Sequence, residues 1–155
     1  MEIVLLKEYP QYKREVSEWL TNEFGTSKSL NFYSEIIHHS LNEGNDLPIT
    51  FIALDNEELV GTIGLWRCDF LPRQDVFPWC AALIVRKDKR KSGIGAMLQE
   101  HVINYSKKLE YNNLYLFTEL KSYFEKTGWR KYGVGYEYNG GEVTIYQYDL
   151  RKCTE

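Results

Sequence analysis

The amino-acid sequence predicts a mixed α/β (α+β) fold, in which a sheet is flanked by helices. Segments with helical apolar spacing alternate with segments of strand character along the chain. Two pairs of strand segments are separated by short turn sequences that are typical of β-hairpins. The chain has 155 residues, long enough for one sizeable core. We therefore expect residues 1–155 to form a single domain.

Helical spacing of apolar residues is clearest in the N-terminal third and in the middle of the chain. Two such segments are each followed by a glycine, Gly25 and Gly44, which is typical of a helix end. A third segment begins directly after a glycine-containing loop. The sequence predicts helices at residues 10–24, 29–42, 92–110 and 120–127.

Strand character lies between and after these helices. Asn56-Glu57 separates two strand segments at two-residue spacing, and Asn139-Gly140-Gly141 separates the last two. Both sequences favour tight turns. The sequence predicts strands at residues 2–7, 48–55, 58–66, 79–86, 113–118, 129–138 and 142–150.

Composition excludes several classes of function. The chain has 19 basic and 22 acidic residues and a net charge of −3, which argues against a nucleic-acid partner. The cysteines Cys68, Cys80 and Cys153 have no metal-ligand spacing and are typical of reduced thiols in a cytosol. His38-His39 has no partner ligand, so no metal site is expected. No apolar run reaches transmembrane length, so we expect a cytoplasmic protein without a membrane partner.

The loop Arg90-Lys91-Ser92-Gly93-Ile94-Gly95 carries the strongest functional signal. It follows the apolar strand 79–86 and begins a predicted helix. Backbone N–H groups at a helix start bind phosphate, and glycine lets the ligand approach closely. The pattern is not a P-loop, and Leu98 stands where a dinucleotide fingerprint needs its third glycine. The sequence therefore predicts a pyrophosphate site of another kind.

The pattern Arg-x-x-Gly-x-Gly after a strand resembles the coenzyme A loop of the GNAT acyltransferases. Three further segments resemble family motifs in the same order: Val60-Gly61, the strand that begins Pro78-Trp79, and the box Tyr123 to Trp129. The predicted element order is also that of the family, over nearly the whole chain. The resemblance implies a mixed, mostly antiparallel sheet, acetyl-CoA as cosubstrate, and direct transfer of an acetyl group to an amine.

The resemblance assigns coenzyme-binding roles to the fourth strand and the loop after it. The backbone of Leu83, Ile84 and Val85 would pair with pantetheine, and one N–H would stabilise the oxyanion. The loop would hold the pyrophosphate through its N–H groups, although an ordinary solvated loop and a nucleic-acid patch are the alternatives. The full set of expected coenzyme-binding residues is Leu83, Ile84, Val85, Arg90, Lys91, Ser92, Gly93, Ile94, Gly95, Ala96, Thr118, Phe124 and Lys126.

The expected general acid is displaced from the family pattern. The family usually places a tyrosine four residues before the glycine of this box, but here Phe124 occupies that position and Tyr123 precedes it. Neighbouring helix positions differ by about 100° in direction. Three alternatives stay open: Tyr123 is the catalytic acid after a local shift, water or another hydroxyl protonates the thiolate, or the site is catalytically weak.

The acceptor side has acidic and aromatic candidates. Strand 79–86 carries no carboxylate, whereas some GNAT enzymes keep a glutamate there. Asp69, Asp75 and Glu119 are candidates for the base or for holding a cationic substrate, with plain surface acids as the alternative. Aromatic residues surround the same loop, and ordinary packing is their alternative role. The expected substrate-binding residues are Trp66, Asp69, Trp79 and Glu119.

The function expected from these observations is acetyl-CoA-dependent N-acetylation of a small-molecule primary amine. The alternatives are a non-catalytic acyl-CoA-binding module, which Phe124 keeps open, and a protein or peptide N-acetyltransferase. The only protein partner expected is a second copy of this chain, in a homodimer.

Overall fold

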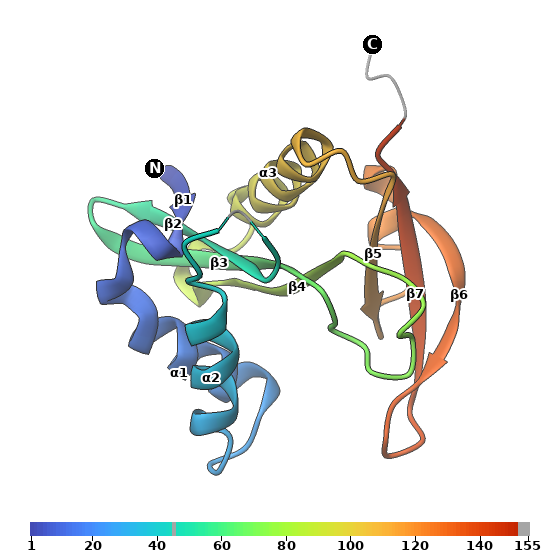
Figure 1. Cartoon of the computed structure of the whole chain (residues 1–155), viewed down its shortest axis with the longest axis horizontal. Helices are drawn as coiled ribbons and strands as arrows, with labels where there is room; N and C mark the ends of the chain where they lie inside the picture. The colour runs from blue at the N-terminus through green and yellow to red at the C-terminus, as the bar shows by residue number, and fades with distance from the viewer. Residues whose placement is uncertain (45, 152–155) are drawn as a thin grey trace.

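The computed structural model describes residues 1–44 and 46–151, which form a seven-stranded sheet with helices on both faces (Figure 1). The strand order is β1-β2-β3-β4-β5-β7-β6, and neighbours are antiparallel except for β4 and β5. This is the mixed, mostly antiparallel sheet that the sequence predicts. The strands are β1 (Glu2–Leu5), β2 (Ile49–Asp55), β3 (Glu58–Trp66), β4 (Trp79–Val85), β5 (Asn113–Thr118), β6 (Arg130–Tyr136) and β7 (Glu142–Asp149).

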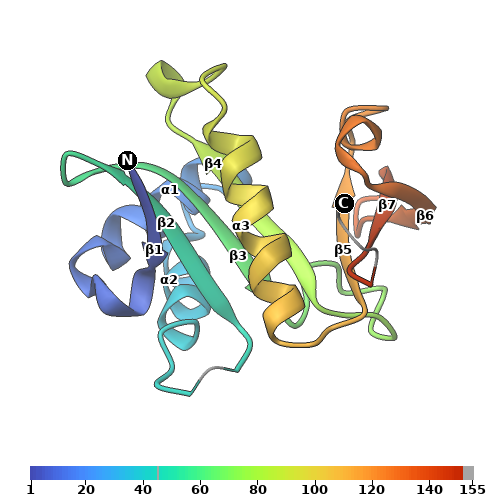
Figure 2. The same ribbon diagram turned by 90° about the horizontal axis from the view of Figure 1, so that it is seen from above.

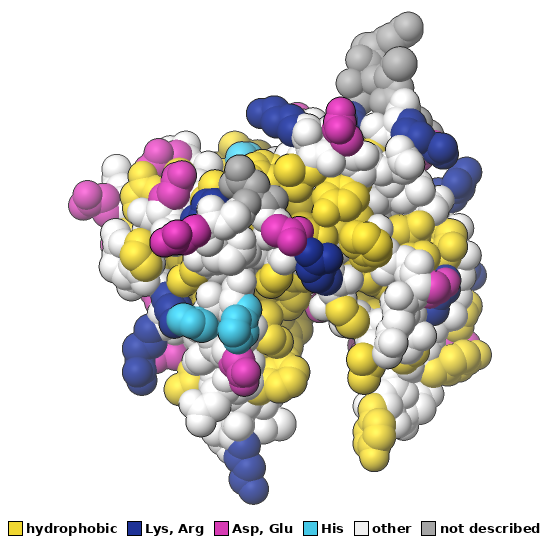
Figure 3. All heavy atoms as spheres, viewed as in Figure 1, with side chains coloured by type: hydrophobic (Ala, Val, Ile, Leu, Met, Phe, Trp, Pro, Cys, Tyr) yellow, Lys and Arg dark blue, Asp and Glu magenta, His cyan; other side chains and the backbone are white. Residues whose placement is uncertain are grey.

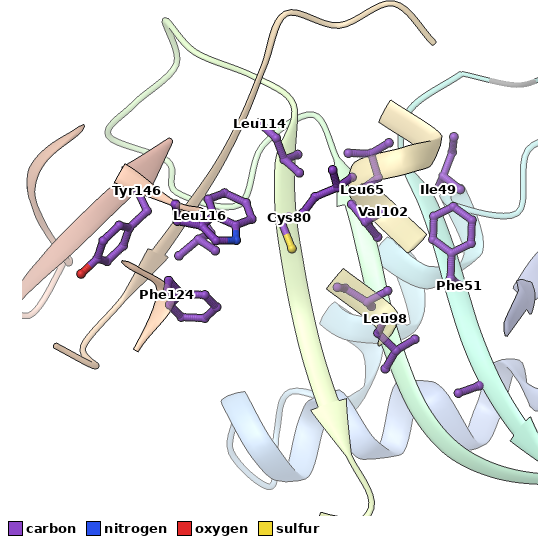
Figure 4. Close-up of a cluster of buried hydrophobic side chains, with 14 of the residues drawn as sticks. Ile49, Phe51, Leu65, Cys80, Leu98, Val102, Leu114, Leu116, Phe124 and Tyr146 are labelled. Atoms are coloured by element: carbon purple, nitrogen blue, oxygen red, sulfur yellow. The ribbon is translucent and has the colours of Figure 1, made fainter. Parts of the chain in front are cut away.

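Helices α1 (Lys13–Phe24) and α2 (Leu30–His39) cover one face of β1–β4, and α3 (Ile94–Lys108) covers the other (Figure 2). Side chains alternate between these layers along a strand, as the pleat requires. On β2, Phe51 packs in the core under α3, whereas Ile52 packs in the core under α1 and α2. Figure 4 shows Phe51 in the first of these cores, beside Val102 and Leu98 of α3.

Both predicted hairpins are confirmed. β2 and β3 are joined by Asn56 and Glu57, which have φ values of 51° and 66°. Two consecutive positive φ values match the twist of a two-residue hairpin loop. The turn between β6 and β7 lies at the predicted Asn139-Gly140-Gly141, where Gly140 has φ 91°.

Several element boundaries differ from the prediction by one to a few residues, and three of the differences have a local cause. The first strand ends at Leu5, because a 3₁₀ turn (Leu6–Glu8) buries Leu6 completely. Helix α2 ends at His39, where the Ser40 hydroxyl donates to the carbonyl of Ile37 and competes with the helical backbone. The helix predicted at 120–127 is only a 3₁₀ turn (Phe124–Thr127), because Ser122 has φ 65° and interrupts a right-handed helix.

The sheet divides between β4 and β5. In the described part of the chain these strands pair only at Trp79 and Tyr115, and they diverge beyond that point (Figure 1). The earlier half therefore consists of β1–β4 with the three α-helices, and the later half consists of β5–β7. Strand β4 forms the border and has one side without a strand partner over most of its length.

Candidate active site

Strand β4 has backbone groups without a strand partner on the side of β5. They face the space where β4 and β5 diverge, which we call the gap. The Arg86 N–H donates to the Val60 carbonyl at 2.9 Å, so the backbone groups of Arg86 point toward β3. Because successive residues of a strand turn their backbone groups to opposite sides, the N–H and C=O groups of Val85 and Leu83 point toward the gap. The Val85 carbonyl accepts a hydrogen bond from Arg90 Nε at 3.0 Å, which agrees with that direction. The backbone of β4 can therefore pair with an extended ligand lying between β4 and β5.

A β-bulge lies in the middle of this edge. Ala81 pairs with Gly64, and Ile84 pairs with Thr62, so two residues of β4 stand opposite one residue of β3. Ala82, the first of the two, has φ 52°, an uncommon value for a residue other than glycine. A bulge bends a strand and re-aims its backbone groups, and bulges are frequent beside active sites. Here it includes Leu83, the first of the three residues, Leu83 to Val85, of which one N–H is predicted to stabilise the oxyanion.

The start of α3 is built to receive an anion. Gly93 precedes the helix with φ 88°, and no side chain caps the N–H groups of the first turn. A Cβ added at Gly93 would meet no described atom within 4 Å, and one at Gly95 would meet only Val85 Cγ2, at 3.7 Å. The packing of the protein therefore does not require glycine at position 95. Uncapped N–H groups beside open space bind phosphate, as the sequence predicts for residues 91–96.

The basic side chains of this region divide into paired and available charges. Arg86 forms ion pairs with Asp88 at 2.7 Å and Glu58 at 3.3 Å, and Lys89 lies 3.7 Å from Asp55. Arg90 and Lys91 are exposed and form no ion pair with a described residue. Of the charges left without an ion pair among the described residues, which also include the exposed Lys87, those of Arg90 and Lys91 are nearest to the helix start in the sequence. The Ser92 hydroxyl donates to the Lys89 carbonyl and holds the loop instead.

Phe124 and Tyr123 occupy different environments. Phe124 is 8% exposed and packs against the rings of Trp129 and Tyr146, whereas Tyr123 is 52% exposed and meets Phe124 edge-on at 4.9 Å. Figure 4 shows Phe124 in the core cluster that spans the gap toward Cys80 of β4. The phenylalanine therefore packs in this core, whereas the tyrosine ring is half exposed. The catalytic role of Tyr123 stays a prediction.

A hollow separates the half with α1 and α2 from the β6–β7 hairpin (Figure 3). The segment of residues 67–78 reaches both sides of it. Phe70 packs against Gly135 of β6, where an added Cβ would lie 2.5 Å from the Phe70 ring. The neighbouring Asp69 lies close enough to Tyr33 of α2 to raise the pKa of its phenol, after the larger effect of burial. Asp69 is therefore near α2, while the neighbouring Phe70 packs on β6.

The Asp69 carboxylate is half-buried, and no described residue forms a hydrogen bond or an ion pair with it. Burial raises the pKa of Asp69 from 3.8 to about 7. Its charge also raises the pKa of Cys80, which burial brings to about 12. An unpaired carboxylate in such a place is typical of a functional group.

The other predicted acceptor residues lie elsewhere. Trp66 and Trp79 are 6% and 0% exposed, and their indole N–H groups donate to Thr50 Oγ1 and the Val76 carbonyl. Trp79 thus offers a substrate no surface. Glu119 is exposed after β5, and Asp75 forms a bidentate ion pair with Arg73 at 2.9 Å.

The remaining candidates are placed as follows. Thr118 Oγ1 accepts a hydrogen bond from the Leu120 N–H at 3.0 Å, and Lys126 is exposed on the 3₁₀ turn. Cys68 is exposed and Cys80 is buried, and neither is in a disulfide, while Cys153 lies outside the described residues. Across residues 1–44 and 46–151, no cluster of His, Cys, Asp or Glu is arranged to hold a metal ion. No helix in this part of the chain is long and apolar enough to cross a membrane.

Two features of the site have no clear signal in the sequence. The bulge at Ala82 occurs in a run that alternation alone would predict to be regular. The indole N–H of Trp129 is buried beside Phe124 and has no hydrogen-bond partner among the described residues. An orphaned donor costs free energy, and a ligand carbonyl in the gap would satisfy it. The residues present therefore fit a polar, extended ligand such as pantetheine.

Comparisons with known proteins agree with this geometry. The model of a family described as the acetyltransferase (GNAT) family matches residues 13–129. An aminoglycoside 6′-acetyltransferase of type Ii is similar in structure, with a TM-score of 0.76 and 22% identity over 99% of this chain and 100% of that chain. An aminoglycoside 6′-N-acetyltransferase complexed with coenzyme A gives a TM-score of 0.74 and 19% identity, with 100% of each chain covered.

A NatC complex bound to Gag peptide and CoA is also similar, with a TM-score of 0.69 and 19% identity over 96% of this chain and 99% of that chain. No curated protein sequence matches the chain. At these identities the likeness to solved structures shows the fold alone.

Proposed function

Because the chain belongs to the acetyltransferase (GNAT) family, it is an N-acetyltransferase, and we propose that it transfers the acetyl group of acetyl-CoA to a small-molecule primary amine. The observation that carries this proposal is the course of the open β4 edge. It runs from Val85, beside the uncapped start of α3, to Trp79, which follows the segment of residues 67–78 with the unpaired carboxylate of Asp69. The edge suits the coenzyme, and the hollow suits a cationic acceptor.

The coenzyme would bind mainly to backbone groups. The N–H groups of residues 91–96 would hold the pyrophosphate, and Arg90 and Lys91 would add charge beside it. Pantetheine would pair with the open side of β4 as an added strand. The thioester carbonyl would then lie near the bulge, where the Leu83 N–H can stabilise the oxyanion that forms as the amine attacks.

The acceptor would bind in the hollow between α2 and the β6–β7 hairpin. Its ammonium group would meet the Asp69 carboxylate, for which no described residue supplies a cation. Aminoglycosides are small molecules that carry amines, and two of the similar structures are aminoglycoside acetyltransferases by name. These observations support a small amine over a protein acceptor.

A panel of acceptors tests the proposal. Purified protein is incubated with acetyl-CoA and single acceptors, namely small polyamines, amino sugars, and peptides with free N-termini or lysines, while release of free thiol is followed. We expect turnover with at least one small amine and less with every peptide. Turnover with peptides alone would overturn the small-molecule assignment and leave the acetyltransferase assignment intact.

A further inference from the structure

We propose that Asp69, from the connection between β3 and β4, is the general base that takes the proton from the attacking amine. This inference rests on the proposed function, because it assigns a step of that reaction to one residue. It places the base outside β4, which carries no carboxylate between Trp79 and Val85.

The position of Asp69 follows from its neighbours on three elements. Phe70 is fixed in the core cluster with Trp79 of β4 and Ile145 of β7. The preceding residue, Asp69, is close enough to Tyr33 of α2 and to Cys80 of β4 for its charge to raise the pKa of both groups. The partly buried carboxylate is therefore near β4, the strand along which we place the thioester.

The surroundings keep Asp69 available as a base. The titratable groups that face it are Tyr33 from α2, Cys68 from its own segment and Cys80 from β4, and the pKa of each is raised. All three are therefore neutral near pH 7, and no described cation offsets the carboxylate charge. A pKa of about 7 lets Asp69 accept a proton and return it to water near neutral pH.

The competing carboxylates have other surroundings. Asp75 is held in its bidentate pair with Arg73, which lowers the pKa of its carboxyl group. Glu119 is exposed after β5. Only Asp69, among the three acidic candidates, combines partial burial with a free carboxylate.

The step balances as follows. An amine enters as R–NH₃⁺, and Asp69 takes one proton directly or through one water and later releases it to solvent. The nitrogen lone pair forms the N–C bond to the thioester carbonyl, and the C–S bond breaks with its electron pair going to sulfur. The second proton leaving nitrogen ends on the coenzyme A thiol. The products are the amide, coenzyme A and one proton.

The test compares Asp69→Asn with Asp75→Asn, a matched loss of one carboxylate from the same segment. We expect Asp69→Asn to lower kcat by about 10²-fold at pH 7, within the range that general base catalysis supplies, and to leave coenzyme A affinity unchanged by calorimetry. Asp75→Asn should retain kcat. The kcat of the wild type should decrease as the pH is lowered, with an apparent pKa near 7. This acidic limb of the pH–rate profile should be absent in Asp69→Asn.

Three outcomes would overturn the assignment. The first is an Asp69→Asn variant with wild-type kcat and pH profile, and the second is a variant changed only in KM, which would make Asp69 a binding residue. The third concerns the carboxyl group itself, titrated by ¹³C NMR in the free protein. A pKa near 4 there would exclude the proposed base, whichever acceptor the protein uses.

The design separates this inference from the proposed function. If only peptides are acetylated, the small-molecule assignment fails, and the same variants are compared with the best peptide. Folding is checked by thermal unfolding at pH 8. Because the folded pKa is raised, the ionised carboxylate destabilises the fold above pH 7, so Asp69→Asn should be at least as stable as the wild type.

Discussion

The two ends of the β4 edge differ in the groups that form the proposed sites, which are backbone groups at one end and side chains at the other. At the α3 end, the proposed coenzyme site consists of N–H groups, carbonyls and space left by glycine, and most side chains around it are exposed or paired with one another. At the other end, the proposed acceptor site depends on side chains from distant segments, such as Tyr33 and Asp69. A backbone site is set by a short local motif, whereas a side-chain site is set by tertiary packing. The variants below test this difference.

The largest effect is expected where the backbone site needs empty space. Gly95→Trp should weaken coenzyme A binding by at least about tenfold, or about 1.4 kcal/mol, because the indole would fill the approach path of the pyrophosphate. The protein itself leaves room for the side chain. Calorimetry with coenzyme A measures the change.

Gly133→Trp on β6 is the control, since its added Cβ also meets no described atom within 4 Å. It should bind coenzyme A normally. An equal loss of affinity in both variants would mean that the loop is not the pyrophosphate site.

A smaller gain is expected at the buried aromatic position of the gap. Phe124→Tyr should raise kcat by a few-fold, within the scale of general acid catalysis, because it places a hydroxyl where the leaving sulfur is expected. Thiol release at saturating acetyl-CoA measures it. A lower kcat with unchanged stability would argue that position 124 is not the position of the general acid.

The charge beside the backbone site should contribute modestly. Arg90→Ala should weaken coenzyme A binding about three- to fivefold at low salt, and the loss should shrink as ionic strength rises, because the side chain is exposed. Binding is measured at two salt concentrations. Lys131→Ala, an exposed charge on β6, serves as the control, and a loss that ignores salt would indicate a disturbed loop rather than a lost charge.

The smallest effect is expected at Tyr123. Tyr123→Phe should change kcat by less than about twofold, because the ring is half exposed while Phe124 occupies the buried place beside it. The assay is the same thiol release. A loss of about 10²-fold at unchanged acetyl-CoA affinity would instead identify Tyr123 as the acid.

Much of the fold follows from local patterns. The hairpins were predictable because Asn56-Glu57 and Asn139-Gly140-Gly141 are short turn sequences between strand segments, and the Tyr12 hydroxyl additionally donates to the Glu57 carbonyl. The glycine-containing start of α3, where we propose the pyrophosphate site, was predictable for the same reason, since Gly93 both ends a loop and begins a helix. By contrast, Ser122, between β5 and the 3₁₀ turn, has a positive φ that the helical apolar pattern did not predict, and it interrupts the predicted helix.

The acceptor side was only partly predictable. The sequence indicates Asp69 as one of three acidic candidates, but it does not distinguish them, because their difference is burial and pairing. Asp75 is paired with Arg73 and Asp69 is not, although both lie in one short segment. Similarly, Trp66 and Trp79 are of a residue type that often lines binding sites for amines, yet the fold buries both rings. Burial depends on contacts between residues far apart in the sequence.

The single residue pair between β4 and β5 has a consequence for the motions of the protein. Cooperative unfolding units follow contiguous hydrogen-bonded structure. In this sheet the hydrogen-bonded ladder is nearly interrupted between β4 and β5. Amide hydrogens in β5–β7 can then exchange with solvent through openings that leave β1–β4 intact. A molecule bound along that line would couple the two units and slow this exchange without changing any bond within either half. The catalytic cycle would thus alternately tighten and loosen the whole sheet.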